Sequence, residues 1–207
     1  SLLTGAVEDS DFKVSMPVWN LVSDGASVFV VGWFSSVAGQ PRKHLARLND
    51  KMALEPFQVA SFFAQDAAAL ALDGATLYAQ DQAALRAIDV QTGQFKAGFN
   101  CSVTNATVAR VAGGVLWLGG SFATAQGVPR LHAAAVDPAT GALLSWDPRP
   151  SAPVADLAAA GGTVLVAGGF VALPAVVRAG LAIIDMAKGE VSPAAPGVSG
   201  GQKSVTA

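Results

Sequence analysis

The stretch Val115-Leu-Trp-Leu-Gly-Gly-Ser-Phe122 decides how this chain folds, because its pattern returns at fixed positions. Glycines with a phenylalanine two residues later stand at Gly32, Gly120 and Gly168. A Thr-Gly pair precedes each of these glycines at the same distance, at Thr4-Gly5, Thr92-Gly93 and Thr140-Gly141. A period of roughly 40 to 50 residues is typical of propellers, solenoids and repeat arrays. The chain is therefore expected to consist of repeated structural units.

The stretch from Pro153 to Pro196 shows one unit most clearly. Short apolar and β-branched runs bounded by glycine pairs predict strands that end in tight turns. Four such strands are expected, at Val154–Ala160, Thr163–Ala167, Leu181–Asp185 and from Glu190 onward. Four short strands in about 45 residues are typical of a propeller blade.

The sequence thus predicts an all-β fold, a β-propeller with four-stranded antiparallel blades of about 45 residues. The expected blades cover 14–59, 60–101, 102–150 and 151–196, and the second is shortened. Residues 1–13 match the end of a preceding blade, and 197–207 match the start of another. We therefore expect residues 1–207 to be an excerpt of a larger ring.

Hairpin turns recur at the end of the third predicted strand, and they begin at Asp89, Asp137 and Asp185. The aspartate accepts backbone N–H groups across the turn, and Gly93 and Gly141 supply the positive φ at its exit. In the first unit Asn49 replaces the aspartate and Ala53 replaces the glycine. That turn is expected to be the most distorted.

An arginine recurs in the long loop after each marker glycine, at Arg42, Arg130 and Arg178. The end of the next strand carries Asn49, Asp137 or Asp185. We expect each arginine to pair with that residue and fix the loop to its blade. The alternative is a ring of cations for an acidic ligand. The second unit lacks this loop.

Composition excludes some classes of function. A net charge of −2 gives no electrostatic surface for nucleic acid or for an anionic membrane. Cys101 is the single cysteine, so no internal disulfide framework is possible. Leu157–Val177 has no charge and is long enough to span a bilayer, but its glycines and Pro174 predict buried strands instead. No membrane span and no signal peptide are predicted.

Several motifs together resemble a known group of repeats. These are Val115–Phe122, Gly127-Val-Pro-Arg130, Ala133–Gly141 and Trp146-Asp-Pro148. They resemble the secreted β-propeller repeats of uncharacterised bacterial and algal surface proteins. They are also similar to kelch repeats, which have a glycine pair after a buried strand and a tryptophan after the next turn. The resemblance implies a propeller and is not specific for an activity.

Enzymes on similar propellers need residues that this chain largely lacks. Copper sites like that of galactose oxidase need Tyr, Cys and His ligands, and the candidates here are Tyr78, Cys101, His44 and His132. The two histidines occupy equivalent loop positions in different units. Quinoprotein dehydrogenases usually carry adjacent cysteines, and this chain has none. We therefore predict a chain that is not an enzyme, without catalytic, cofactor-binding or metal-binding residues.

Two kinds of residue remain as candidate sites. Asn100-Cys-Ser102 and Asn105-Ala-Thr107 fit the N-glycosylation pattern in a loop between units, although this short pattern also arises by chance. Trp33 stands where other units have Ser121 and Gly169, so its ring is expected at an exposed blade edge, where it would be available to a ligand. The other three tryptophans are expected in the core.

The sequence favours a non-enzymatic, extracellular structural or protein-interaction module of a cell surface, filament or matrix. Its partners would be other protein chains, among them copies of itself, and no nucleic acid. A carbohydrate-binding propeller that uses exposed aromatics is the alternative, and part of a secreted oxidoreductase is the third hypothesis. The fold by itself does not decide between them.

Overall fold

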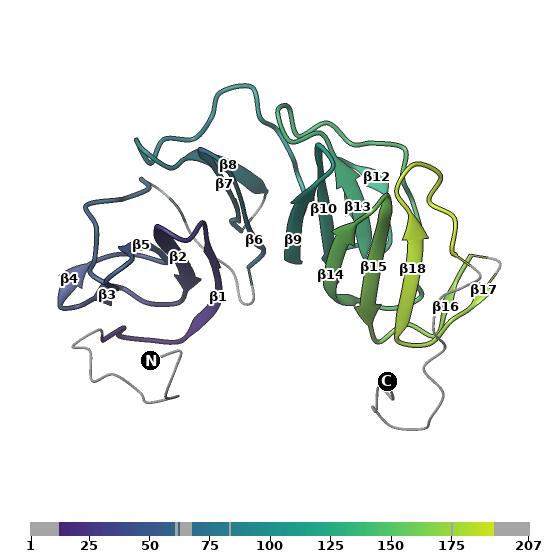
Figure 1. Cartoon of the computed structure of the whole chain (residues 1–207), viewed down its shortest axis with the longest axis horizontal. Helices are drawn as coiled ribbons and strands as arrows, with labels where there is room; N and C mark the ends of the chain where they lie inside the picture. The colour runs from purple at the N-terminus through teal and green to yellow at the C-terminus, as the bar shows by residue number, and fades with distance from the viewer. Residues whose placement is uncertain (1–12, 61, 63–67, 83, 175, 193–207) are drawn as a thin grey trace.

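The computed structural model describes residues 13–60, 62, 68–82, 84–174 and 176–192, and all regular structure in these ranges is β (Figure 1). The all-β prediction is confirmed for this part of the chain. The predicted end of a preceding blade, apart from Lys13, and the predicted start of a following blade lie outside the described residues.

Within the described ranges, four antiparallel three-stranded sheets follow one another along the chain, each with its second strand in the middle. Unit 1 consists of β1 (Val18–Ser23), β2 (Ser27–Gly32) and β5 (Leu45–Asn49). Unit 2 consists of β6 (Leu70–Asp73), β7 (Thr76–Gln80) and β8 (Leu85–Asp89). Unit 3 consists of β9 (Ala106–Ala112), β10 (Val115–Gly120) and β13 (Ala133–Val136). Unit 4 consists of β14 (Val154–Ala160), β15 (Thr163–Gly168) and β18 (Leu181–Asp185).

Short β-hairpins stand where units 1, 3 and 4 were expected to have only a long loop. They are β3 (Ser36–Val37) with β4 (Gln40–Pro41), β11 (Thr124–Ala125) with β12 (Val128–Pro129), and β16 (Ala172–Leu173) with β17 (Val176–Val177). Each lies at the end of its sheet where the second strand ends. The segment entering the unit supports the hairpin, as in the bridges from Val14 to Val37 and from Val103 to Ala125.

The fourth strand of each predicted blade is reduced to a single bridge. The bridges join Leu48 to Leu54, Ile88 to Phe95, Val136 to Leu143 and Ile184 to Val191. Two backbone hydrogen bonds flank each bridge, such as Asn49 N to Ala53 O and Glu55 N to Arg47 O. Each unit is therefore a three-stranded sheet with a short outer segment. This corrects the expected four full strands.

The first strands of consecutive units pack against one another, β1 on β6, β6 on β9 and β9 on β14. Figure 1 shows the four sheets placed one after another along an arc. The core lies between the sheets. Phe29 of unit 1 meets Phe57 edge-on at 5.5 Å in a cluster that includes Leu77 of unit 2. Neighbouring units therefore share their apolar cores.

The uncharged stretch Leu157–Val177 forms most of β14, all of β15 and the hairpin β16–β17. The prediction of strands is confirmed for its described residues, but the strands are only partly buried, because Leu165 and Val177 are exposed. No helix in the described ranges has the length and apolar character that a membrane crossing requires.

The turn after β5 differs from the other three as predicted. Asn49 N bonds to Ala53 O, whereas Asp137 N reaches one residue further along its turn, to Ala142 O. Met52 adopts a φ of 58° in this shorter turn. A non-glycine residue thus takes the left-handed conformation that Gly93 and Gly141 provide in units 2 and 3.

Candidate interaction surface

Five of the ten exposed large apolar side chains of the described residues lie on or beside the three short hairpins. We call this set the hairpin surface, and it consists of Trp33, Val128, Leu131, Val171 and Val177. Val171 is 63% exposed and Val177 is 85% exposed. Single exposed apolar residues are common on proteins, but these recur at the same end of different sheets. Such a recurring apolar surface suits contact with another macromolecule.

Trp33 is 51% exposed and has aromatic neighbours from two other segments. Its ring centroid lies 6.0 Å from that of Trp19 on β1 and 5.7 Å from that of His44, which precedes β5. His44 Nδ1 lies 3.2 Å from Gly32 O. The exposed position expected for Trp33 agrees with this geometry. Trp117 and Trp146 are buried, whereas Trp19 is only half-buried.

Arg42 and Arg130 bind backbone carbonyls, not the residues at the ends of the following strands. Arg42 Nη2 donates to Glu55 O at 2.9 Å, and Arg130 Nη2 donates to Leu144 O at 3.1 Å. These two carbonyls would accept the next bond of each outer ladder. The guanidinium takes that place in units 1 and 3, whereas the outer segment of unit 2 ends after one bridge without such an arginine.

The expected pairing of Arg130 with Asp137 is therefore wrong. Asp137 Oδ1 accepts the backbone N–H of Ala139 and of Thr140 within its own turn. Arg130 Nη1 instead lies 3.6 Å from Asp147 Oδ2. Arg42 likewise bonds to carbonyls and not to Asn49. Arg178 occupies the corresponding loop position after β17.

The glycines of the hairpin turns have a second role that sequence patterns did not indicate. A Cβ on Gly93 would overlap the carbonyl oxygen of Gln58, and one on Gly141 would overlap that of Asn100. Each turn thus packs closely on the segment that leaves the preceding unit. Asn100 N also donates to Thr140 O at 2.9 Å. The turns dock one unit on the next.

Backbone N–H groups lower the pKa of Asp89 and of Asp137. The N–H of Thr92 is the main cause for Asp89 and that of Thr140 is the main cause for Asp137, followed by the two threonine hydroxyls. Asp185 accepts the backbone N–H groups of Ala187 and Lys188 within its own turn. These three aspartates serve their own turns, as predicted.

Both candidate glycosylation asparagines are exposed, in the segment between units 2 and 3. Asn105 has a φ of 58°, a left-handed conformation that asparagine tolerates better than most residues. Its carbonyl accepts the N–H of Ser121 at 3.1 Å. The backbone therefore supplies a structural reason for Asn105, and no comparable reason applies to Asn100.

The residues considered for a copper site do not form one group, because Tyr78 and Cys101 belong to the core between units 2 and 3 whereas the two histidines lie in loops of units 1 and 3. The Tyr78 hydroxyl donates to Pro138 O at 2.7 Å. Cys101 is buried, and burial raises the pKa of its thiol to about 11. His44 and His132 lie in units 1 and 3, each with a φ of 64°. Within the described ranges, no three His, Cys, Asp or Glu side chains gather as metal ligands.

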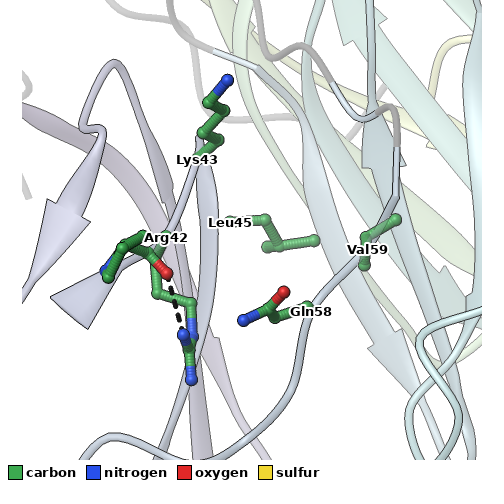
Figure 2. A pocket seen from close by; sticks show the side chains of 6 residues that line it. Arg42, Lys43, Leu45, Gln58 and Val59 are labelled. Atoms are coloured by element: carbon green, nitrogen blue, oxygen red, sulfur yellow. Dashed lines mark hydrogen bonds between the residues drawn. The ribbon is translucent and has the colours of Figure 1, made fainter.

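A hollow lies beside the hairpin of unit 1, where the chain leaves that unit. It has a volume of about 230 Å³. Pro41, Arg42, Lys43, Leu45, Gln58 and Val59 line it. Figure 2 shows the Gln58 side chain extending toward Arg42, whereas Lys43 extends away from the guanidinium. A cation and an amide thus border this opening.

Comparison with known proteins supports the fold. The WD40 β-propeller domain of Doa1 is similar with a TM-score of 0.52 and 12% identity, over 86% of this chain and 68% of that one. The computationally designed protein Ika4 gives a TM-score of 0.46 at 15% identity, over 68% of this chain and 78% of that one. The designed protein Ika8 gives 0.45 at 11% identity, with coverages of 85% and 73%. The similarity to the Doa1 domain supports a propeller-like fold for this chain.

No protein-family description matches the sequence. No curated protein matches it either.

Proposed function

We propose that this chain is a non-enzymatic module that binds other protein chains through the hairpin surface, as part of an extracellular or cell-surface protein. The observation that carries the proposal is the repeated exposure of apolar side chains at one end of the sheets, with Val171 and Val177 the most prominent in unit 4. Apolar surface of this kind gains free energy when a partner covers it. Within this proposal the four units are blades of a propeller ring.

The test is a comparison of tagged protein with a Val171→Glu/Val177→Glu variant, cross-linked in the native source and analysed by quantitative mass spectrometry. Both substitutions keep an exposed position but place charge on the apolar surface. We expect at least one protein to be enriched tenfold or more with the wild type and lost with the variant. Met52→Glu, at an exposed turn off the hairpin surface, is the matched control. Recovery of the same proteins with all three would contradict the proposal.

A second function, carbohydrate binding, has one specific observation in its favour. Trp33 is half exposed and is supported from behind by the rings of Trp19 and His44, so its orientation is fixed before a ligand arrives. A sugar ring would stack on this face. Binding to a glycan array that disappears in Trp33→Ala but persists in Trp19→Phe would support this function. An array without signal for the wild-type protein would remove it.

The extracellular location depends on the two asparagines and is measured directly. Glycopeptide mass spectrometry on protein from its native source would find modified Asn100 if the chain passes through a eukaryotic secretory route. Unmodified peptides at both Asn100 and Asn105 would leave the protein-binding function standing and withdraw this support for the location.

A further inference from the structure

Arg42 carries a buried positive charge with an incomplete set of partners. The residue is 7% exposed. Its Nη1 donates to Pro41 O at 2.8 Å and its Nη2 to Glu55 O. Its Nε has no hydrogen-bond partner among the described residues and is closed to solvent, as is Nε of Arg130, so the difference between the two arginines lies at Nη1. A guanidinium stays charged at any ordinary pH, so burial without a counter-charge costs free energy.

The internal repeat shows what is missing. Ala53 and Ala142 hold the same place in their turns, because each carbonyl accepts the N–H of the residue that begins the turn. Counting on from these two alanines aligns Glu55 with Leu144 and Gln58 with Asp147. The arginines confirm the alignment, since Arg42 binds Glu55 O as Arg130 binds Leu144 O. Where unit 3 has an aspartate, unit 1 has a neutral amide.

In unit 3 the aspartate compensates the arginine. Asp147 Oδ2 lies 3.6 Å from Nη1 of Arg130 and 2.7 Å from Nε of Arg149. The side chains of Arg130 and Asp147 are both mostly buried, at 12% and 15% exposure. Nη1 of each arginine also donates to the preceding proline carbonyl, so both guanidinium groups are held alike. A carboxylate at the corresponding place in unit 1 would therefore meet Nη1 of Arg42.

The neighbouring charges do not fill this place. The carboxylate of Glu55 lies 2.7 Å from Nε of Arg47 and is engaged there. Lys43 lines the same hollow and adds a second positive charge to its surroundings. The described residues thus surround the opening with positive charge and a neutral amide, in a hollow of about 230 Å³.

We propose that the hollow beside Arg42 binds the carboxylate of an acidic side chain of a partner protein, in the place that Asp147 holds beside Arg130. The source of the carboxylate rests on the proposed protein-binding function. A charge-assisted bond to a partly desolvated guanidinium is stronger than one between neutral groups and fixes the orientation of the partner. The hollow would thus fix the orientation of a bound partner, which contact with the apolar hairpin surface alone does not do.

The test is an NMR titration of the ¹⁵N-labelled chain with the capped peptide acetyl-Gly-Asp-Gly-amide. We expect saturable shifts at the amides of Lys43, Gln58 and Val59, and no saturable shift with the Asn version of the peptide. Acetate should bind at least threefold more weakly than the aspartyl peptide. The absence of a saturable response to the aspartyl peptide would overturn the proposal. Equal affinity for acetate and peptide would overturn its assignment to a protein side chain.

Three variants make the test specific. Gln58→Asp places a carboxylate inside the hollow and should weaken peptide binding at least tenfold, whereas Gln58→Asn should leave it unchanged. Asp147→Asn should create a new response around Arg130 in unit 3. Unchanged binding in Gln58→Asp, in a variant with wild-type circular dichroism, would show that the peptide binds elsewhere and contradict the proposal.

Binding measurements with the native partner test the carboxylate site and the protein-binding function separately. If a partner captured through the hairpin surface binds Gln58→Asp as well as wild type, the carboxylate site is wrong and the protein-binding function stands. If no partner depends on the hairpin surface but the peptide titration is positive, the hollow binds carboxylates and the proposed function fails.

Discussion

His44, His132 and Gly180 hold the same position in units 1, 3 and 4, and their φ values are 64°, 64° and 76°. From the sequence the two histidines were candidates for a metal site. Gly180 at this position in unit 4 shows instead that the position is defined by its backbone conformation. Residues other than glycine adopt this conformation at a cost of about 1–2 kcal/mol. The fold requires a left-handed residue at this position, and His44 and His132 adopt that conformation with strain.

A glycine at position 132 should therefore be more stable than an alanine. His132→Gly and His132→Ala both remove the imidazole, whose Nδ1 is buried without a partner among the described residues. Only the alanine keeps a Cβ in the left-handed region. We expect His132→Gly to exceed His132→Ala by about 1 kcal/mol in the free energy of unfolding, measured in urea. Equal stabilities would show that the backbone relaxes at this position.

Glycines with positive φ differ in what surrounds them, and this difference is measurable. Gly127 has a φ of 74° with open space around its Cβ position, whereas a Cβ on Gly93 would overlap Gln58 O. Gly127→Ala should cost about 1 kcal/mol for the conformation. Gly93→Ala should cost clearly more, about 3 kcal/mol or above, because the docking of unit 2 on unit 1 must also shift. Similar losses in both variants would contradict the docking role of the turn.

At the scale of elements, each hairpin turn joins the end of the third strand to the outer segment. Asp137 organises its turn through the N–H groups of Ala139 and Thr140, and the same bonds lower the pKa of its carboxyl. Because this pKa is lower in the folded chain, the ionised aspartate stabilises the fold above its unfolded pKa. The contribution disappears as the pH falls through the folded pKa.

Asp137→Asn should therefore change how stability depends on acid. The amide oxygen can still accept turn bonds, but it cannot ionise. We expect the variant to be less stable than the wild type at neutral pH and the difference to shrink as the pH falls below about 4. Urea unfolding at several pH values measures this, with Asp50→Asn, an exposed carboxylate in the turn of unit 1, as the control. A difference that is constant with pH would rule out the ionised form as the stabilising one.

The sequence located the first three strands of unit 4 well, and the reason is local. Glycine pairs and Asp-led turns bound each strand, as Gly161-Gly162 does between β14 and β15. The short hairpins were missed because a pair of two-residue strands is too short for alternation to be visible. The reduced fourth strand was missed because a pairing that ends after one bridge has no signature in the sequence. In units 1 and 3, Arg42 and Arg130 bind the carbonyls where the pairing ends.

The candidate site was predictable to a lesser degree. Comparing units pointed to the exposure of Trp33, because Ser121 and Gly169 hold its place elsewhere. Val177 gave no such signal, since an apolar residue in an apolar run is indistinguishable from core. The hollow beside Arg42 became visible only when the turn hydrogen bonds aligned Gln58 with Asp147. The shorter turn at Asn49 conceals that alignment in the sequence.

At the scale of the whole molecule, the apolar clusters lie between units and bind them together. Cys101 belongs to the cluster that joins units 2 and 3, where it packs with Tyr78 of β7 and Leu118 of β10. In the next cluster Trp117 and Trp146 meet at 5.0 Å, and Trp146 Nε1 donates to Asp185 O of unit 4. Loss of one unit would therefore expose the core of its neighbour.

The thiol of Cys101 reports on this shared core. Burial raises its pKa to about 11, so at pH 8 the folded protein holds very little reactive thiolate. We expect alkylation by iodoacetamide to be at least a hundredfold slower in the native chain than in urea. The rate should increase together with the loss of near-ultraviolet circular dichroism as urea is raised. Rapid labelling of the folded chain would show that units 2 and 3 separate without global unfolding.

The single bridge at the outer side of each unit has a mechanical consequence. The outer segment is the last part of each sheet, and two backbone bonds, such as Asn49 N to Ala53 O and Glu55 N to Arg47 O, hold it to the third strand. Under tension along the chain, the two backbone hydrogen bonds would break one after the other and would not share the load in shear. In each unit the outer segment should thus detach from the third strand at low force while the inner strands stay paired. The outer segments are then compliant elements in series with stiff sheets.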